Sequence, residues 1–140
     1  NDAQKKFYIN QYFPFLDKRL VCLIVDEKDD VVAFGVSMPS LSKALRKCKG
    51  KLFPFGWIHV LRALKNFENI DLYLNGVKPE WQNKGVHSIY YSEMNNQYIK
   101  LGVKMAIANP QLETNQAANI WEKYDSRIAI RRRAYIKTIE

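Results

Sequence analysis

The regular part of the chain opens with two apolar runs separated by a short polar segment. Residues 20–26 (LVCLIVD) and 31–38 (VVAFGVSM) are rich in aliphatic and β-branched side chains, whereas residues 27–30 (EKDD) are all charged. Two such runs with a short polar connection predict a β-hairpin. Apolar residues occupy most positions on both faces of these strands, which indicates a sheet covered on both sides.

Segments with the helical period alternate with extended segments through the rest of the chain. In chain order, the pattern predicts helices over 43–47 and 57–67, a strand over 69–77, a helix over 86–101 and a strand over 103–108. A helix capped at Thr114 or Asn115 follows, and then a strand, or a bent pair of strands, over 127–139. Residues 1–19 are expected to form a short helix or an irregular arm. This order predicts an α/β fold with a mixed, mostly antiparallel central sheet flanked by helices.

Two of the predicted helices have a clear apolar side. In the helix over 86–101, the apolar stripe consists of Val86, Ile89, Tyr90, Met94, Tyr98 and Leu101. In the helix that follows residue 114, the inner face consists of Ala117, Ala118, Trp121 and Tyr124. Both helices are therefore expected to pack against the sheet. Ser40 or Ser42 is expected to cap the short helix over 43–47.

Composition limits the protein class further. A chain of 140 residues suits one domain, and no apolar run approaches the roughly 20 residues that a membrane helix needs, so no membrane partner is expected. Two cysteines, Cys22 and Cys48, are too few for a disulfide framework, and no His/Cys cluster has zinc spacing, which favours a cytoplasmic protein without a metal. The chain begins without Met and is interpreted as a fragment of a longer protein. Its net charge of +8 suits an anionic ligand.

The segment 77–87 (VKPEWQNKGVH) connects the predicted strand over 69–77 to the predicted helix over 86–101. Backbone N–H groups at a helix start have no intrahelical acceptor, and the helix dipole is positive there, so such a turn can bind a phosphate or pyrophosphate. Gly85 allows close approach of an anion, while Gln82 and Lys84 add a neutral donor and a positive charge. An ordinary strand-to-helix turn is the alternative interpretation.

The pattern Val-x-Pro-x-x-Gln-x-x-Gly resembles the acyl-CoA pyrophosphate loop of the GNAT N-acetyltransferase superfamily, written Gln/Arg-x-x-Gly-x-Gly/Ala after a strand ending in Val-x-Pro. Val77, Pro79, Gln82 and Gly85 match, and His87 stands where the family has a small residue. The resemblance implies a GNAT-like domain over 20–140 that follows an arm over 1–19. It also implies that residues 39–68 are a helical insertion and that the family's first strand and helix are missing or replaced.

The resemblance implies acetyl-CoA or another acyl-CoA as co-substrate, bound between two diverging strands that correspond here to 69–77 and 103–108. The implied cofactor-binding residues are Val77 for the pantetheine amides, the turn residues Gln82, Asn83, Lys84, Gly85, Val86 and His87 for the pyrophosphate, and Asn115. His87 has three interpretations: it blocks the site, it helps to bind an anion when protonated, or it faces solvent with no role.

In this family an acyl group passes from the thioester to an acceptor, usually an amine, and the amine must lose a proton. Glu113 is the candidate base, and it is equally suited to a carboxylate at a helix start. The segment from Asn115 is similar to the family pattern Asn-x-x-Ala-x-x-x-Tyr-Glu-Lys, but Trp121 precedes Glu122 where the Tyr belongs. Tyr124, one turn later, is the candidate acid, with a core tyrosine as the alternative.

Three functions follow from these residues. The first is an N-acyltransferase that moves an acyl group directly from acyl-CoA to an amine acceptor. The second is a non-catalytic GNAT-like binding or partner domain of a longer protein, motivated by His87 and Trp121. The third, a nucleic-acid-binding domain, rests on charge alone and is not favoured. Residues 43–51 form a basic cluster that equally suits a solvated helix face. The three arginines at 131–133 lie in a predicted strand, so alternate side chains point to opposite faces and their charge is dispersed. A homodimer, or packing against another domain of the parent chain, is compatible with the first two.

Overall fold

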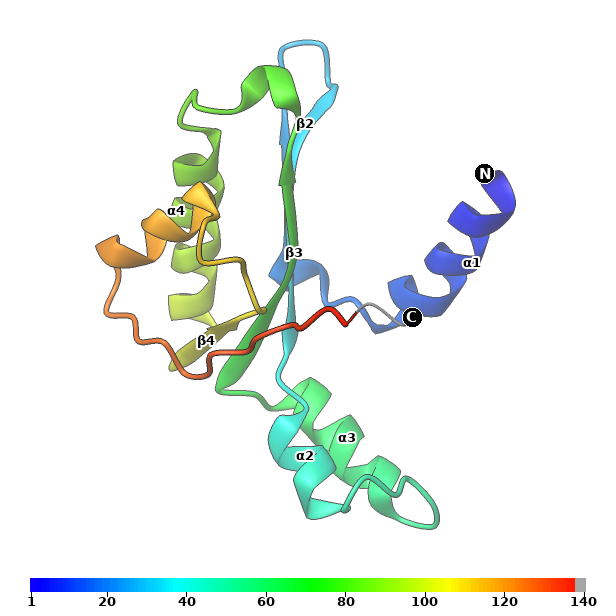
Figure 1. Ribbon diagram of the computed structural model, residues 1–140. Coiled ribbons are helices and arrows are strands. Elements are labelled where there is room, and N and C mark those ends of the chain that lie inside the picture. The colour runs from blue at the N-terminus through cyan, green and yellow to red at the C-terminus, as the bar shows by residue number, and fades with distance from the viewer. Residues whose placement is uncertain (138–140) are drawn as a thin grey trace. The chain divides into compact units, whose positions relative to one another are not determined.

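The computed structural model describes residues 1–137, and the chain divides into two compact units, Asn1–Ile107 and Ala108–Glu140, which are described separately here. The helices are α1 (Asp2–Tyr12), α2 (Ser42–Lys47), α3 (Gly56–Lys65) and α4 (Val86–Lys100) (Figure 1). The strands are β1 (Val21–Val25), β2 (Val31–Pro39), β3 (Asn69–Val77) and β4 (Met105–Ala108). Short 3₁₀ helices cover Phe13–Phe15, Lys18–Leu20, Pro79–Trp81 and Gln116–Lys123.

The predicted α/β class is confirmed by a four-stranded mixed sheet with the order β1-β2-β3-β4. β2 runs antiparallel to both β1 and β3, so these three strands form a meander. β4 follows β3 through α4, and the N–H groups of Lys104 and Met105 donate to the carbonyl of Glu68 at 2.7 and 3.3 Å. The starts of β3 and β4 therefore lie side by side, as expected for a parallel pair joined by a helix.

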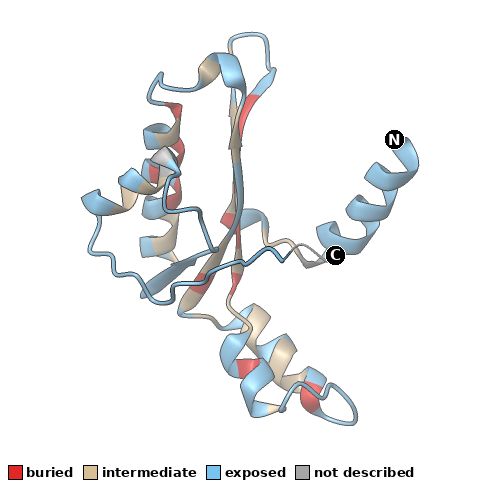
Figure 2. Cartoon of the chain, in the orientation of Figure 1, coloured by how far each residue is buried: buried red, intermediate tan, exposed pale blue. Residues whose placement is uncertain are grey.

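α4 covers one face of the sheet, over β1 and β2 (Figure 2). Tyr90 lies against Gly35, where an added Cβ would be 2.6 Å from the ring atom Cε2. One turn further along, Met94 is 2% exposed, and burial of such a side chain stabilises the fold by about 1.5–3 kcal/mol. The hydroxyl of Tyr98 lies 2.5 Å from Oγ of the buried Ser37. The predicted apolar stripe is therefore the contact surface of α4.

Two positions on α4 differ from the predicted stripe. Ile89 is 60% exposed, whereas Tyr91, which the pattern does not include, is buried. The two residues flank Tyr90 on opposite sides of the helix. A small rotation of α4 about its axis decides which of them faces the sheet, and the sequence period does not fix that rotation.

Within the first unit, the opposite face of the sheet carries exposed apolar side chains. Leu23 lies opposite Phe34, and Val36 lies opposite Leu74, so these side chains share the face that α4 does not cover. Leu23 is 60% exposed, and Phe34 and Leu74 are also exposed. The expectation that the sheet is covered on both sides is therefore not met within the first unit, where α4 covers one face. Apolar composition alone does not say which element covers a face of a sheet.

The α2–α3 hairpin connects β2 to β3. Both helices lie within about two residues of their predicted bounds, but the predicted serine caps are wrong: Leu41 is the N-cap residue of α2, and no side chain caps it. Ser40 Oγ instead contacts Ser42 Oγ at 3.4 Å. The hairpin begins after Pro39 and returns at Asn69, so it extends from the end of the sheet opposite Val77 (Figure 1).

The second unit differs most from the sequence prediction. The helix expected after Thr114 is a 3₁₀ helix over Gln116–Lys123, with bonds such as Ala118 N–H to Asn115 O at 2.9 Å. The strand expected over 127–139 is wrong for 127–137, which form no regular element; residues 138–140 lie outside the described part. Strand propensity depends on pairing and packing, so β-rich composition alone does not make this segment a strand. The arm over 1–19 and the domain over 20–140 stay predictions.

Candidate functional site

The turn between β3 and α4 has the predicted boundaries. β3 ends at Val77, the 3₁₀ helix Pro79–Trp81 follows, and α4 begins at Val86 with Gly85 as its N-cap. Asn83 and Gly85 both have left-handed backbones, with φ of 59° and 77°. These two residues lie in the segment where the chain turns from the end of β3 into α4. Glycine is the residue that adopts such a φ without steric cost.

The start of α4 is open to a ligand. Among the described residues no side chain caps Gly85, and the first turn of α4 contains no acidic residue. An added Cβ at Gly85 would meet no heavy atom within 4 Å, so the space beside the glycine is not filled by protein. The positive end of the helix dipole and uncapped amide donors therefore meet an open space, which is the arrangement that binds phosphate groups.

Gln82 and Lys84 brace the turn. Gln82 Nε2 donates to the carbonyl of Val77 at 3.2 Å, so the side chain folds back onto the end of β3. Lys84 Nζ lies 5.2 Å from the centre of the Trp81 ring, a distance typical of a cation–π contact. Lys84 is thereby held over the turn as a positive charge. The bond to Val77 uses one of the two N–H donors of the Gln82 side chain.

His87, the residue that departs from the family pattern, is partly buried. Its ring centre lies 6.3 Å from that of Tyr90, with the ring planes tilted by 50°. The imidazole therefore runs along the flank of α4 toward the next turn. Tyr90 is itself buried, and burial raises the pKa of its hydroxyl above the ordinary value. The contact with Tyr90 anchors His87 on the helix beside the N-terminal amides.

β3 and β4, which correspond to the two strands that the resemblance implied, are neighbours in the sheet, whereas their divergence stays a prediction. They are bonded where both begin, at Glu68, and the ion pair between Lys104 Nζ and Glu68 Oε1 at 2.7 Å reinforces this end. β4 is four residues long and β3 is nine, so β4 is the shorter of the two neighbouring strands.

A β-bulge lies in the middle of β3, and the sequence gives no sign of it. Val36 pairs with Leu74 but the next residue, Ser37, pairs with Leu72, so Tyr73 is an extra residue in β3. Bulges twist a strand locally and re-aim its backbone, and they are common beside active sites. Near the bulge, Asn75 Nδ2 donates to the hydroxyl of Tyr91 at 3.3 Å. The sequence does not reveal the bulge, because a bulge depends on how two strands pair. The sequence also does not reveal Tyr91, because Ile89 fits the helical period of the predicted apolar stripe better than Tyr91 does.

The candidate acid and base lie in the second unit. Glu113 Oε1 forms an exposed ion pair with Arg131 Nε at 3.4 Å. Tyr124 is partly exposed, and its ring centre lies 6.3 Å from that of Trp121. Trp121 Nε1 donates to Gln111 Oε1 at 3.2 Å, which orients the indole within this unit. The turn before α4 belongs to the first unit, and the Glu113 ion pair belongs to the second.

Asn115, the last of the predicted cofactor-binding residues, lies in the second unit. The backbone N–H of Asn115 donates to the carbonyl of Leu112 at 3.0 Å, at the start of the 3₁₀ helix. Over the part of the chain that the structure describes, no group of three or more His, Cys, Asp or Glu side chains is arranged to hold a metal ion. None of the described helices is both long and apolar enough to cross a bilayer. Cys22 and Cys48 are both free thiols.

No family model and no curated protein sequence matches the chain. Solved structures do match it. They include the aminoglycoside 6'-N-acetyltransferase AAC(6')-IG from Acinetobacter haemolyticus, with a TM-score of 0.57 and 10% identity over 100% of this chain and 83% of that chain. The aminoglycoside N-acetyltransferase AAC(6')-Iy, solved in complex with CoA, has a TM-score of 0.56 and 11% identity over 97% of this chain and 88% of that one. A possible acetyltransferase from Clostridium difficile 630 has a TM-score of 0.53 and 15% identity over 99% of this chain and 78% of that chain.

These similarities show the fold class. The chain has a GNAT-like acyltransferase fold, as the resemblance of the turn implied.

Proposed function

We propose that the protein is an N-acyltransferase that moves an acetyl or other acyl group directly from acyl-CoA to an amine acceptor. The observation that carries this proposal is the turn before α4, where no side chain caps the helix start and the space beside Gly85 is open. A structural neighbour solved with CoA supports the choice of acyl donor. The two free cysteines favour a reducing compartment such as the cytoplasm.

The residues of the turn fit a diphosphate. The N–H groups of Val86 and His87 supply hydrogen bonds, Lys84 supplies a positive charge, and no acidic residue in the first turn of α4 repels the anion. The pantetheine arm would lie along β3 and bond its backbone near Val77, in the opening between β3 and β4. This placement brings the thioester toward the middle of β3, where the bulge at Tyr73 lies.

The transfer itself needs few protein groups. The amine nitrogen attacks the thioester carbonyl carbon, the C–S bond breaks, and the nitrogen gives up one proton as CoA leaves as a thiol. We assign the base to the Glu113 carboxylate and the acid to the Tyr124 hydroxyl, both of which this chain holds in its second unit. The Arg131 partner of Glu113 is exposed, so an incoming ammonium ion can compete with it.

Calorimetric titration with acetyl-CoA tests the first step of this proposal. Saturable binding of both acetyl-CoA and CoA is expected, together with a rise in the unfolding temperature that grows with ligand concentration. Absence of any heat or thermal shift at millimolar acetyl-CoA would remove the transferase from consideration. Turnover is then measured as release of free CoA thiol in the presence of a panel of primary amines.

A second candidate is a GNAT-like domain that does not catalyse transfer. His87 in place of a small residue and Trp121 in place of the family's tyrosine favour it. It predicts that acetyl-CoA binds weakly or not at all and that no amine in the panel releases thiol above the uncatalysed rate. Binding with turnover therefore supports the first candidate, and its absence in both assays supports the second.

A further inference from the structure

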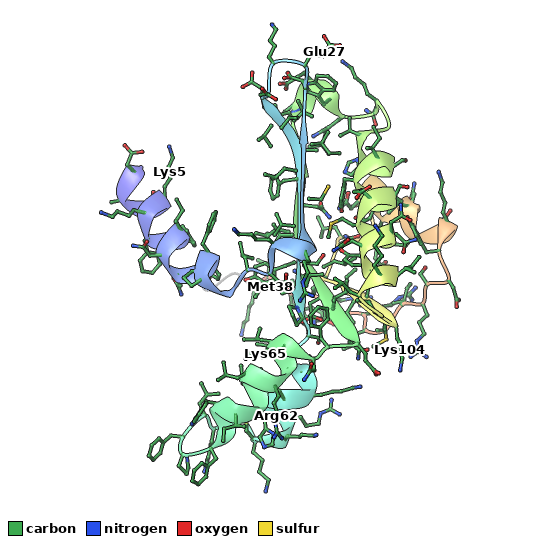
Figure 3. The ribbon with its side chains drawn as sticks, turned by 180° about the vertical axis from the view of Figure 1, so that it is seen from behind. Lys5, Glu27, Met38, Arg62, Lys65 and Lys104 are labelled. Atoms are coloured by element: carbon green, nitrogen blue, oxygen red, sulfur yellow. The ribbon has the colours of Figure 1, made fainter. Side chains whose placement is uncertain are left out.

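The tip of the α2–α3 hairpin holds apolar side chains out in solvent. Phe53 and Phe55, in the connection between the two helices, are 87% and 70% exposed, and their neighbours Leu52 and Trp57 are about half exposed at 52% and 50%. The hairpin projects from the sheet, and aromatic rings gather at its far end (Figure 3). A contiguous group of large exposed apolar side chains indicates an interaction surface.

The connection that presents these rings is held in shape by the hairpin itself. Trp57 Nε1 donates to the carbonyl of Pro54 at 2.9 Å, and the Trp57 backbone N–H donates to Leu52 O at 3.0 Å. Gly56 is buried, and an added Cβ there would lie 1.9 Å from the carbonyl oxygen of Lys51. The loop therefore closes tightly on its own backbone. Phe53 and Phe55 are directed outward by this ordered loop, which reduces the entropy lost when they bind something.

The hairpin is also the most positively charged part of the chain. Residues 31–67 contain no Asp or Glu and seven basic residues, all exposed: Lys43, Arg46, Lys47, Lys49, Lys51, Arg62 and Lys65. This segment therefore carries a charge of +7, against +8 for the whole protein. Three of the seven, Lys47, Lys49 and Lys51, directly precede the apolar tip. Figure 3 shows Arg62 and Lys65 on α3, between the tip and the sheet.

We propose that this hairpin tip is a docking site for an anionic lipid bilayer, with which the protein associates peripherally. Apolar side chains such as Phe53 and Phe55 enter the boundary between headgroups and acyl chains, about 5–10 Å deep, while Lys47, Lys49 and Lys51 lie at the level of the lipid phosphates. No helix needs to span the bilayer for this mode of binding. The sequence prediction that a membrane is not a partner considered only a spanning segment.

Two features favour a bilayer over single-stranded nucleic acid. A nucleic-acid site needs a groove that follows the strand and flat stacking platforms along it. The apolar group here forms the projecting end of a hairpin and includes the aliphatic Leu52, which offers no stacking face. A protruding apolar end surrounded by lysines matches the layered chemistry of an anionic membrane surface.

Vesicle co-sedimentation tests the proposal with the full chain. Vesicles of phosphatidylcholine alone and of phosphatidylcholine with 30% phosphatidylserine are compared at low and physiological salt. The protein is expected to pellet with the anionic vesicles at least tenfold more than with the neutral ones, and salt should weaken that binding. Equal binding to both vesicle types, or to neither, overturns the proposal.

Variants assign the binding to the tip. The double substitution Phe53→Ser and Phe55→Ser should lower the partition coefficient about tenfold or more, whereas Phe7→Ser with Phe13→Ser, at positions 61% and 63% exposed in the N-terminal part, should leave it unchanged. Far-UV circular dichroism verifies folding. If the tip variant binds as well as the wild type, the proposal fails.

A charge-matched pair provides the second test, and it decides the matter should the aromatic variant not fold. Lys49→Glu with Lys51→Glu should weaken binding about tenfold or more, while Lys18→Glu with Lys28→Glu changes the net charge equally and should have a much smaller effect. Equal losses in the two variants would show general charge attraction and overturn the assignment to the tip. Gel filtration and a single-stranded DNA shift assay complete the set: loss of self-association or of DNA binding in the tip variants, without loss of vesicle binding, also overturns it.

Discussion

Two glycine-to-alanine variants, Gly85→Ala and Gly102→Ala, separate an effect on ligand binding from an effect on stability. Gly85 lies at the start of α4, and Gly102 lies just beyond its end. The two glycines have φ of 77° and 72°, and an added Cβ would meet no heavy atom within 4 Å at either. A left-handed backbone costs a residue with a Cβ roughly 1–2 kcal/mol. Gly85→Ala and Gly102→Ala should therefore lower the free energy of unfolding by about the same amount, measured by urea titration.

Acetyl-CoA affinity should fall in Gly85→Ala alone. The new methyl group would occupy open space beside the N–H groups of Val86 and His87, where the proposal places the pyrophosphate. Loss of one hydrogen bond to a charged group costs about 1.5–3 kcal/mol. That cost corresponds to a roughly ten- to hundredfold rise in Kd, within the range of calorimetric titration.

The matched control makes the result decisive. Gly102→Ala has the same backbone strain but lies at the C-terminal end of α4, far from the amide donors. If both variants weaken acetyl-CoA binding equally, the effect comes from general destabilisation. If Gly85→Ala binds as tightly as the wild type, the pyrophosphate does not lie at the start of α4 and the reasoning is refuted.

Three further predictions concern the packing of α4 on the sheet and the chemistry of one thiol. Gly35→Ala brings a Cβ within 2.6 Å of the Tyr90 ring and should lower the free energy of unfolding by about 1–3 kcal/mol. In a double-mutant cycle, adding Tyr90→Leu should recover part of this loss. If the losses of the two single variants simply add in the double variant, the two residues are not in contact. Tyr98→Phe removes the hydroxyl 2.5 Å from the buried Ser37 Oγ and should cost about 1–3 kcal/mol in denaturant unfolding; adding Ser37→Ala should cost less than the sum, because no buried hydroxyl then lacks its partner. Burial raises the pKa of the Cys22 thiol, so the rate of its alkylation by iodoacetamide should rise at a higher pH than the rate for free cysteine. The rate is measured against pH by mass spectrometry. If the midpoint of the Cys22 rate profile is equal to or lower than that of free cysteine, the thiol is not desolvated.

The sequence predicts the elements of the first unit because their signals are local. β3 and the start of α4 are marked by a β-rich run, a Pro, and a glycine whose observed φ of 77° only glycine adopts readily. The hairpin of β1 and β2 is marked by a charged turn between apolar runs. In each case the residues that decide the structure lie within a few positions of one another.

The differences arise where distant residues decide the structure. The bulge at Tyr73 depends on how β3 pairs with β2, and the choice between Ile89 and Tyr91 depends on the rotation of α4 over the sheet. The segment 127–137 has the residues of a strand but no pairing within the described chain. The apolar pattern over Gln116–Lys123 does not distinguish a 3₁₀ helix from an α-helix, because Ala118 and Trp121 are three residues apart whereas Ala117 and Trp121 are four apart.

The same distinction separates the two halves of the proposed active site. The proposed anion site needs only the turn from Val77 to His87, so a short pattern contains all the donors that the proposal requires, and no side chain caps the start of α4. Proton transfer needs side chains brought from elsewhere, and Glu113 and Tyr124 were chosen from a weaker pattern. Substituting them therefore tests a different claim: Glu113→Gln should lower kcat with acetyl-CoA affinity unchanged. A loss of affinity in that variant would mean that Glu113 supports the binding site and that another group takes the proton.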